Sequence, residues 1–428
     1  MRSRKLSLVA IPLALLTSLA PASATTEVTP TSPVIVVNNG PGDQTDGHVS
    51  GDWVAYTNSL SATNEIRYHN LVTGSDAAIP SNGASDFLSD ISGTLVAFTR
   101  VTDHSAIMTF DVSQPTLPPV ELAPQAGSNR RYAQIGGRTV AWVDYGFNAS
   151  ALLSEIVTYD LDTKVATRLT NDTMLDWTPA VSPDGSVVVW AKCSTTGTGC
   201  QIWQAVRNTA GSWVTSQLTL GNCQNFLPDS NGQIVAYAAT CNGEADIYWQ
   251  PVGGGPEHRL VRPGAQQHPT VSGSVIAFET YNGTTLQWDI DAYDTATDTL
   301  YHVANSLGDK SLPDVSIGTD GLVRVVWTAC CYDVYARKFS TSLTPAQRIG
   351  NLITLVQGMN IDPLVKTTLV ASLQQIQTTV TLQDITTTCT LLNAFIAQVR
   401  AQSGVGLTVD QANQILSVAN AVKLALAC

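Results

Sequence analysis

Polar residues recur at one position of a repeated sequence unit, a few residues before a glycine. Three of them are aspartates, Asp90, Asp229 and Asp314, and a fourth is His48. Converging carboxylates and an imidazole could hold a hard cation such as Ca²⁺, and two facing carboxylates could support glycoside hydrolysis. The alternative is a solvated channel in which water satisfies these groups. The polar residues at this position, called the column below, are His48, Asp90, Gln134, Asp229, Thr270 and Asp314.

Aromatic and charged residues lie two to four positions before the column. Flat apolar area beside oriented hydrogen-bonding groups suits an interface with a protein or a sugar. A second interpretation is that Phe87, Trp177 and Phe226 are spacers packed between repeats, because they share one repeat position. The set, called the rim below, is Phe87, Arg130, Arg131, Tyr132, Asp176, Trp177, Phe226 and His268.

The unit that positions column and rim is a glycine, a short spacer, an apolar run and an aromatic residue. It occurs seven times, and its aromatic residues are 42, 44, 48, 47, 41 and 49 residues apart. Strand-like units with a period of about 40–50 residues are typical of a β-propeller. We expect the repeat aromatics to lie in the core rather than in a site. They are Tyr56, Phe98, Trp142, Trp190, Tyr237, Phe278 and Trp327.

Each repeat predicts four strands, A to D, because alternating apolar runs are separated by turn residues. Strand A precedes the glycine and strand B ends in the aromatic. In such a blade the D–A and B–C loops lie on one face. We therefore expect the column at the entry to strand A, ringing one mouth of the central channel, with the rim beside it.

The last repeat lacks a strand D and ends near Phe339. Residues 33–37, Pro-Val-Ile-Val-Val, form a good strand with no partner of their own. Pairing of this strand into the last blade would close the ring and remove an exposed edge. The sequence thus predicts a mainly β fold, a seven-bladed propeller over residues 33–341 preceded by a linker at 25–32. A six-bladed ring with a stray element is the alternative.

From residue 344 the periodicity becomes helical. Thr344-Pro-Ala-Gln347 and Thr408-Val-Asp-Gln411 are capping boxes, and Asp362-Pro363 begins a further helix. Four amphipathic segments predict a small helical bundle over residues 344–428.

The N-terminus has the pattern of a secretory signal. Residues 1–24 contain a basic start, an apolar run from Leu6 to Leu19 and a small-residue cleavage site ending at Ala24. We expect an exported, secreted or periplasmic protein, a monomer with no membrane span.

The charge of the chain is strongly negative. The net charge is −12, or −15 without the three basic residues of the signal. The C-terminal helical part contributes +1, so the propeller carries −16. This argues against nucleic acid or an anionic membrane as a partner.

Eight cysteines in an exported chain indicate disulfides. Cys193 and Cys200 flank one predicted hairpin loop, Cys223 and Cys241 bracket the first two strands of the fifth repeat, and Cys389 and Cys428 are alone in the C-terminal part; we pair them accordingly. The adjacent residues Cys330 and Cys331 would form a strained vicinal disulfide, two free thiols or an intermolecular bond.

The repeats resemble the TolB-like family of propellers, in which a Pro-x-x-Ser-Pro-Asp-Gly turn precedes strand B. Pro179-Ala-Val-Ser-Pro-Asp-Gly185 matches in full, and the segments at 268–273 and 312–316 match in part. The resemblance implies the fold. Because TolB itself has an α/β domain before its propeller and this sequence has no room for one, a direct role in the Tol envelope system is not expected.

The C-terminal segment from Leu392 to Gly404 is similar to the FIMAH-type helical module found at the ends of secreted bacterial proteins. That resemblance covers about 80 residues and implies an accessory role, since the module has no established chemistry.

Catalytic motifs are scarce. The sequence has no Gly-x-Ser-x-Gly elbow, no His-Glu-x-x-His and no sialidase Asp box. We expect a non-catalytic binding or scaffold protein without a cofactor, which binds protein or glycan at the face of the D–A and B–C loops. The competing hypothesis is a metal-assisted lyase or hydrolase of carbohydrate at the channel, using Asp90, Asp229, Asp314 and His48.

Overall fold

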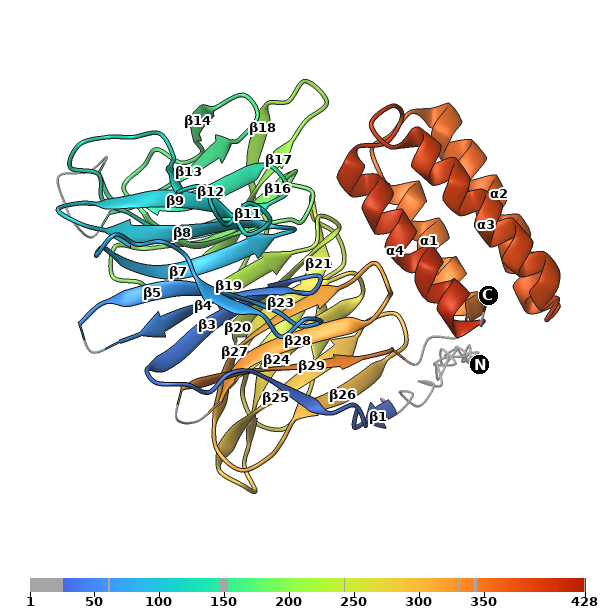
Figure 1. Ribbon diagram of the computed structural model, residues 1–428, viewed down its shortest axis with the longest axis horizontal. Helices are drawn as coiled ribbons and strands as arrows, with labels where there is room; N and C mark the ends of the chain where they lie inside the picture. Colours follow the sequence, from blue (N-terminus) through green and yellow to red (C-terminus); the bar gives the residue numbers. More distant parts are fainter. Residues whose placement is uncertain are drawn as a thin grey trace, which may run out of the picture.

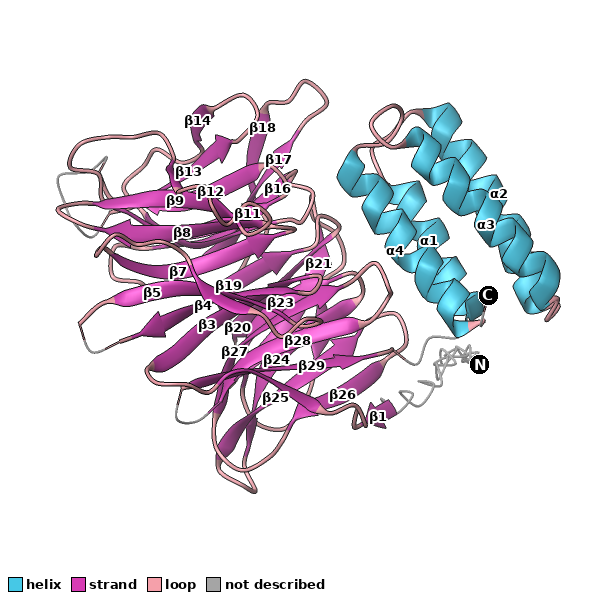
Figure 2. Ribbon diagram, viewed as in Figure 1, coloured by secondary structure: helices cyan, strands magenta, loops and turns pink. Residues whose placement is uncertain are grey.

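The computed structural model describes residues 26–60, 62–146, 153–241, 243–329, 332–341, 345–426 and 428. It contains a seven-bladed β-propeller followed by four helices, as predicted (Figure 1). Figure 2 shows the two parts side by side, with strands confined to the propeller and helices to the C-terminal part. The predicted signal, residues 1–24, and the pair Cys330 and Cys331 lie outside the described residues.

The first six blades each contain four consecutive antiparallel strands, A to D. Blade 1 consists of β3 (Asp43–Ser50), β4 (Trp53–Ser59), β5 (Asn64–Asn70) and β6 (Asp76–Ala78). Blade 2 consists of β7 (Ser85–Ser92), β8 (Leu95–Val101), β9 (Ser105–Asp111) and β10 (Val120–Glu121). Blade 3 consists of β11 (Arg130–Gly136), β12 (Thr139–Asp144), β13 (Glu155–Asp160) and β14 (Val165–Arg168). Blade 4 consists of β15 (Leu175–Val181), β16 (Val187–Cys193), β17 (Gln201–Arg207) and β18 (Trp213–Gln217). Blade 5 consists of β19 (Gln224–Ser230), β20 (Ile234–Thr240), β21 (Ala245–Pro251) and β22 (His258–Leu260). Blade 6 consists of β23 (Gln266–Ser272), β24 (Val275–Asn282), β25 (Gln287–Asp294) and β26 (Thr299–Ala304).

Blade 7 is completed by the N-terminal strand, as predicted. Its strands A to C are β27 (Lys310–Ile317), β28 (Val323–Ala329) and β29 (Asp333–Phe339), and strand D is β2 (Val34–Asn38), antiparallel to β29. A further strand, β1 (Thr26–Val28), pairs in parallel with β26 as a fifth strand of blade 6. The segment 25–32, interpreted above as a linker, therefore contains a strand. Three residues are too few to show a two-residue alternation.

The repeat aromatics fill the spaces between blades. Six of the seven are fully buried, and Trp327 is 3% exposed. This confirms their assignment to the core. Each blade buries its apolar face against the next because a single four-stranded sheet cannot cover both of its faces.

Every strand A contains the same irregularity two residues before the column. The register shifts there, for example between Thr45 and His48, and one residue adopts a positive φ of 47–58°. These seven residues, called the bulge ring below, are Asp46, Leu88, Tyr132, Thr178, Leu227, His268 and Leu312. A bulge interrupts the alternation of apolar and polar residues that marks a strand. The first half of strand A therefore cannot be recognised as strand from the sequence pattern.

The prediction that the column lies at the entry to strand A is therefore wrong. His48, for instance, is the sixth of the eight residues of β3. Strand A begins several residues earlier than its pattern indicates. The column consequently lies inside the channel, toward the A–B turns.

Four helices form the C-terminal bundle: α1 (Pro345–Gly358), α2 (Pro363–Thr381), α3 (Ile385–Gln402) and α4 (Val409–Ala425). Asp362 caps α2, its carboxylate accepting from the N–H groups of Leu364 and Val365. At α4 the predicted capping box is present, because Thr408 and Gln411 exchange side-chain and backbone hydrogen bonds. The capping box before α1 includes Thr344, which is outside the described residues. The bundle has its own apolar core, centred on residues such as Leu373, Phe395 and Ile415.

Candidate functional site

A cavity of about 880 Å³ runs along the central channel of the propeller. All seven bulge-ring residues and the column contribute to its wall, together with residues of the A–B turns. Helix α4 contributes Asp410, Asn413, Gln414, Ser417 and Val418, and α1 contributes Leu355. Helix α4 therefore crosses the end of the channel at the A–B turns, with Asp410 near Gly137 of blade 3 and Ala421 near Gly321 of blade 7.

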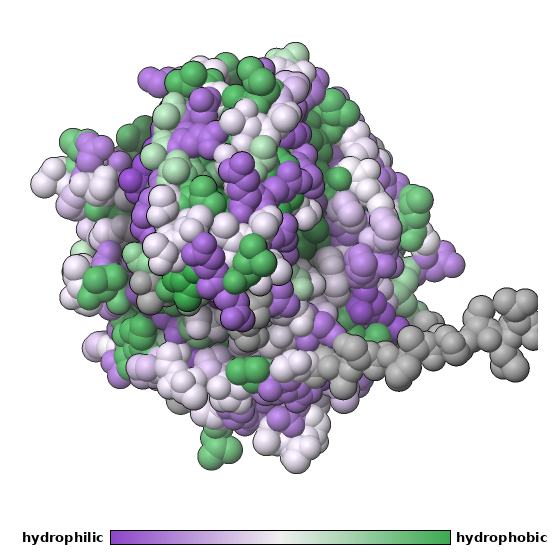
Figure 3. Space-filling model, turned by 90° about the vertical axis from the view of Figure 1, so that its right-hand side faces the viewer, coloured by the Kyte–Doolittle hydropathy of each residue, from purple (hydrophilic) through white to green (hydrophobic). Residues whose placement is uncertain are grey.

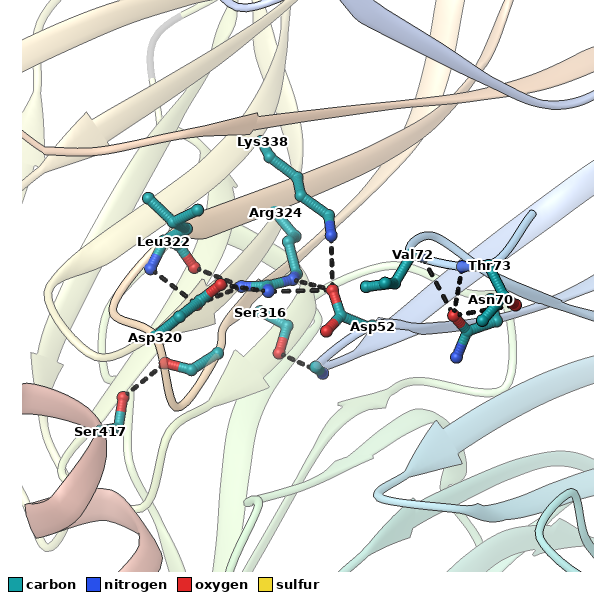
Figure 4. Close-up of polar contacts among 12 residues, drawn as sticks. Asp52, Asn70, Val72, Thr73, Ser316, Asp320, Leu322, Arg324, Lys338 and Ser417 are labelled. Atoms are coloured by element: carbon teal, nitrogen blue, oxygen red, sulfur yellow. Dashed lines mark hydrogen bonds and ion pairs between the residues drawn. The ribbon is translucent and has the colours of Figure 1, made fainter. Parts of the chain in front are cut away.

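The docking of α4 is marked by one buried hydrogen bond. Ser417 Oγ donates to the backbone oxygen of Gly318, in the A–B turn of blade 7, at 2.8 Å (Figure 4). At Gly321, φ is +73° and a Cβ atom would come within 2.0 Å of Ala421 Cβ. The bundle thus sits so close to this turn that the position admits no side chain.

The structure brings together His48, Asp90 and Asp314 of the column. His48 Nδ1 is 3.4 Å from Asp90 Oδ1 and 3.8 Å from Asp314 Oδ2, and its Nε2 is 3.5 Å from Asp46 of the bulge ring. These side chains keep 14–21% of their surface exposed in the cavity. Gln134, Asp229 and Thr270 line the same cavity.

Each column aspartate is hydrogen-bonded to the neighbouring blade. Asp90 Oδ2 accepts from the N–H of Ile135 at 2.7 Å, which joins blade 2 to blade 3. Asp229 accepts from Val271 at 2.7 Å and Asp314 from Val49 at 2.6 Å, the latter joining blade 7 to blade 1. In every case the donor is the residue after the column position of the next blade. These aspartates therefore satisfy buried backbone donors between blades.

A second set of contacts runs parallel to the first, nearer the A–B turns. Ser50 Oγ accepts from the N–H of Gly93 at 2.8 Å, and Ser92 Oγ accepts from Gly137 at 2.9 Å. Ser316 Oγ accepts from Gly51 at 3.0 Å. The Ser-Gly pairs of the repeat thus connect consecutive blades.

The protonation of the column follows from its enclosure. Burial disfavours the charged imidazole, but Asp46, Asp90 and Asp314 outweigh it and raise the pKa of His48 to about 10. Burial raises the pKa of Asp314 to about 7 and that of Asp229 to about 6, and it also raises the pKa of Asp90. At neutral pH an imidazolium therefore stands among the carboxyl groups.

The wall of the cavity is acidic. Among its described residues are Asp46, Asp52, Asp90, Asp229, Asp314 and Asp410, but neither a lysine nor an arginine. Within the described part of the chain, no three His, Cys, Asp or Glu side chains are arranged to hold a metal ion.

The rim residues are of two kinds: some are buried and hold strands of the propeller together, and others are accessible to a ligand. Arg130 is 5% exposed and donates from Nε to Asp144 at 3.0 Å. Asp176 is fully buried and accepts from the indole N–H of Trp190 at 2.9 Å. These two charged residues hold strands A and B together and are not available to a ligand.

The rim aromatics are half-buried. Trp177 packs against the core between blades 4 and 5, and Phe226 against the core between blades 5 and 6. Tyr132 packs similarly against blades 3 and 4, and Phe87 is half-buried in β7. This is the position expected of spacers, the second interpretation given above.

Two basic rim residues remain accessible. Arg131 is exposed in β11. His268 lines the cavity, and its Nδ1 lies 2.9 Å from Glu279 Oε1.

Three predicted disulfides are present: Cys193–Cys200, Cys223–Cys241 and Cys389–Cys428. The first two lie in loops at the D–A and B–C face and are joined through Gln224, whose Nε2 donates to Cys200 Sγ at 3.0 Å.

The bulge ring was missed at the level of sequence. A partial signal exists, because four of its members directly precede a proline within strand A: Thr178, Leu227, His268 and Leu312. A proline inside a strand marks a bulge or an edge. The other three repeats lack this signal.

No described helix is both long enough and apolar enough to cross a membrane. Figure 3, viewed from the side on which the bundle lies in Figure 1, shows hydrophilic and hydrophobic residues interspersed over the surface.

Comparison with known proteins found no matching family model and no matching curated protein. Among solved structures, an oligogalacturonate lyase in complex with manganese is 13% identical, with a TM-score of 0.53 over 74% of this chain and 95% of that one. The β-propeller domain of the Trilobed protease from Pyrococcus furiosus is 12% identical, with a TM-score of 0.52 over 71% of this chain and 96% of that one.

A putative TolB from Agrobacterium tumefaciens is 19% identical, with a TM-score of 0.40 over 53% of this chain and 83% of that one. At such identities a likeness concerns the fold and not the activity. The chain thus carries a seven-bladed β-propeller, a fold that the two solved structures with TM-scores above 0.5 support.

Proposed function

We propose that this chain is an exported, non-catalytic binding protein whose propeller presents the face of the D–A and B–C loops to a protein or glycan. One observation carries the proposal: α4 lies over the opposite mouth of the channel, with Ser417 bonded to Gly318. A partner that approaches the channel from the other side meets the D–A and B–C loops and the start of β11, where Arg131 is exposed.

Export is supported by the disulfides. Disulfides persist in oxidising compartments, and three are formed among the described cysteines. Two of them brace loops on the proposed binding face, and rigid loops on one face favour its use in recognition.

The alternative function is a metal-assisted lyase or hydrolase of carbohydrate at the column. The fold likeness to an oligogalacturonate lyase with manganese is what favours it. Against it, the imidazolium of His48 supplies the positive charge that a cation would otherwise bring, and the three aspartates accept from backbone N–H groups. We therefore expect neither Ca²⁺ nor Mn²⁺ to raise the melting temperature.

The alternative has a direct test. The mature protein is incubated with oligogalacturonate in Mn²⁺ or in EDTA, and unsaturated products are followed by absorbance. Turnover that EDTA abolishes and that Asp229→Asn reduces would establish the enzyme and overturn the proposal of a non-catalytic protein.

The proposed face is tested by blocking each side of the propeller in turn. Thr284→Cys, in the B–C loop of blade 6, and Ser75→Cys, in the C–D turn of blade 1, are each exposed and can each carry a polyethylene glycol maleimide. Binding to glycan arrays and to immobilised envelope proteins is then measured. We expect the polymer at residue 284 to block binding and the polymer at residue 75 to leave it intact. Equal effects of the two polymers would refute the assignment of the face.

A further inference from the structure

Large apolar side chains are exposed on the D–A and B–C loops of the later blades. Leu307 is 90% exposed, Leu220 81%, Leu286 71% and Val261 70%. Leu220, Val261 and Leu307 lie in consecutive D–A loops, before blades 5, 6 and 7, and Leu286 lies in the B–C loop of blade 6. Exposed apolar side chains that gather on one face mark an interaction site more often than scattered ones do.

The loop that carries Leu307 is anchored from beneath by a buried ammonium group. Lys310 is 2% exposed, and its Nζ donates to the backbone oxygens of Ser306 and Gly308, on either side of Leu307. The same Nζ lies 3.3 Å from Asp289 Oδ1. The backbone at Leu307 is thereby held while its side chain projects into solvent.

The loop is also fastened to the neighbouring B–C loop, where Leu286 lies. Gln287 Nε2 donates to the oxygen of Ser306 at 2.8 Å, and the N–H of Gly308 donates to Gln287 Oε1 at 3.0 Å. Leu286 has a φ of 56°, a strained value for leucine. This conformation is held by a hydrogen bond from the N–H of Leu286 to the backbone oxygen of Asn282 at 2.8 Å.

These bonds make Leu286 and Leu307, called the leucine pair below, a preorganised apolar feature. A backbone already ordered before association loses less entropy on binding, so a partner gains more from the side chains that it carries. Aliphatic side chains offer a sugar neither a flat ring nor a hydrogen bond, and the rim aromatics that could do so are half-buried. The leucine pair therefore favours apolar protein side chains over glycan.

The charged residues around the leucine pair indicate which residues should flank the apolar side chains of that partner. The buried ammonium of Lys310 is paired with Asp289, and the exposed charged residue of the segments 283–286 and 305–309 is Asp309. The next D–A loop leads to Asp43, also exposed, and the propeller as a whole carries −16. Acidic surroundings favour a basic partner and speed its approach.

We propose that the leucine pair is a docking site for a peptide segment of a partner protein, in which apolar side chains are flanked by lysine or arginine. This deepens the proposed function, because it names the chemistry of the partner at the D–A and B–C face.

The probe is a displayed library of random dodecapeptides, selected on the full mature protein. We expect enriched sequences to place apolar residues between basic ones. Affinities of the enriched peptides are then compared by fluorescence anisotropy for the parent, for Leu286→Asn/Leu307→Ser and for Val72→Ser/Leu117→Ser. Asparagine tolerates the positive φ at position 286, so the first variant should fold. In the control both replaced residues are exposed, at 69% and 54%, but lie on C–D loops of the opposite face.

The leucine-pair variant should weaken binding at least about tenfold, the effect of about 1.4 kcal/mol, while the control changes it less than about twofold. Peptides unaffected by the leucine-pair variant, or no enrichment at all, would overturn the proposal. If the parent protein self-associates and the leucine-pair variant does not, the leucine pair forms a contact between copies of this chain. That result would also overturn the proposal. Glycan binding blocked by the polymer at residue 284, without peptide binding, would overturn this inference but leave the proposed function standing.

Discussion

Asp52 of blade 1 accepts two hydrogen bonds from Arg324 of blade 7, from Nε at 3.0 Å and from Nη2 at 2.9 Å, although the residues are 272 positions apart in the chain (Figure 4). Arg324 is 2% exposed and also donates to Asp320, while Lys338 donates to Asp52 at 2.5 Å. Charge–charge contacts therefore join the last blade to the first, in addition to the strand exchange of β2.

Replacing Asp52 should weaken this closure. Asp52→Ala removes one of the two carboxylates paired with the buried guanidinium of Arg324 and leaves it with Asp320 and the backbone oxygen of Leu322. We expect a loss of about 1–3 kcal/mol in the free energy of unfolding. The control is Asp162→Ala, which breaks the exposed pair with Arg138 and should cost less than about 1 kcal/mol. Urea unfolding followed by tryptophan fluorescence measures both. Equal losses in the two variants would show that the closure does not depend on Asp52.

The docking of the bundle should depend on small residues of α4. Ala421 is 6% exposed and faces Gly321, whereas Ala425 in the same helix is exposed. We expect Ala421→Gln to separate the bundle from the A–B turn of blade 7 and to speed hydrogen exchange at residues 318–322. Ala425→Gln should leave exchange there unchanged. Unaltered exchange in Ala421→Gln, with the helices still formed, would contradict the docking of α4 on this turn.

The disulfide of the bundle should contribute more stability than the short one in blade 4. Cys389–Cys428 spans 39 residues and Cys193–Cys200 spans seven. On loop-closure entropy alone, the two bonds are worth about 4 and about 2.5 kcal/mol. Thermal unfolding of the double-serine variant of each pair measures the order. A larger loss for the pair in blade 4 would mean that local packing outweighs loop length.

Asp176 should make the protein less stable as pH rises from about 4 to about 7. Burial raises the pKa of Asp176 to about 7, against the partial compensation of Lys192 Nζ at 3.7 Å. Because the folded state holds this proton in a range where the unfolded chain has lost it, the free energy of unfolding falls with rising pH there and levels off above pH 7.

Asp176→Asn can still accept from the indole of Trp190 and should reduce this slope, measured by urea unfolding between pH 4 and pH 8. The control is Asp103→Asn, at an exposed side chain of a B–C loop. The same slope in the parent and in Asp176→Asn would show that Asp176 does not titrate in this range.

Much of the architecture was determined by the sequence alone. The glycine-to-aromatic unit predicted seven blades, the unpaired apolar strand near Val36 predicted the closure of the ring, and Thr408 with Gln411 predicted the start of α4. Such patterns can be read because they report local periodicity, capping and turn chemistry, which depend on residues close together in the chain.

The tertiary structure alone decided what the polar residues do. The bulge in each strand A moved the column from the expected entry into the channel, and the carboxylate of Asp314 turned out to accept from Val49, 265 residues away. Neither the contact between Ser417 and Gly318 nor the exposure of Leu307 has a local pattern. These features arise from the packing of distant segments against one another, which no single window of the sequence contains.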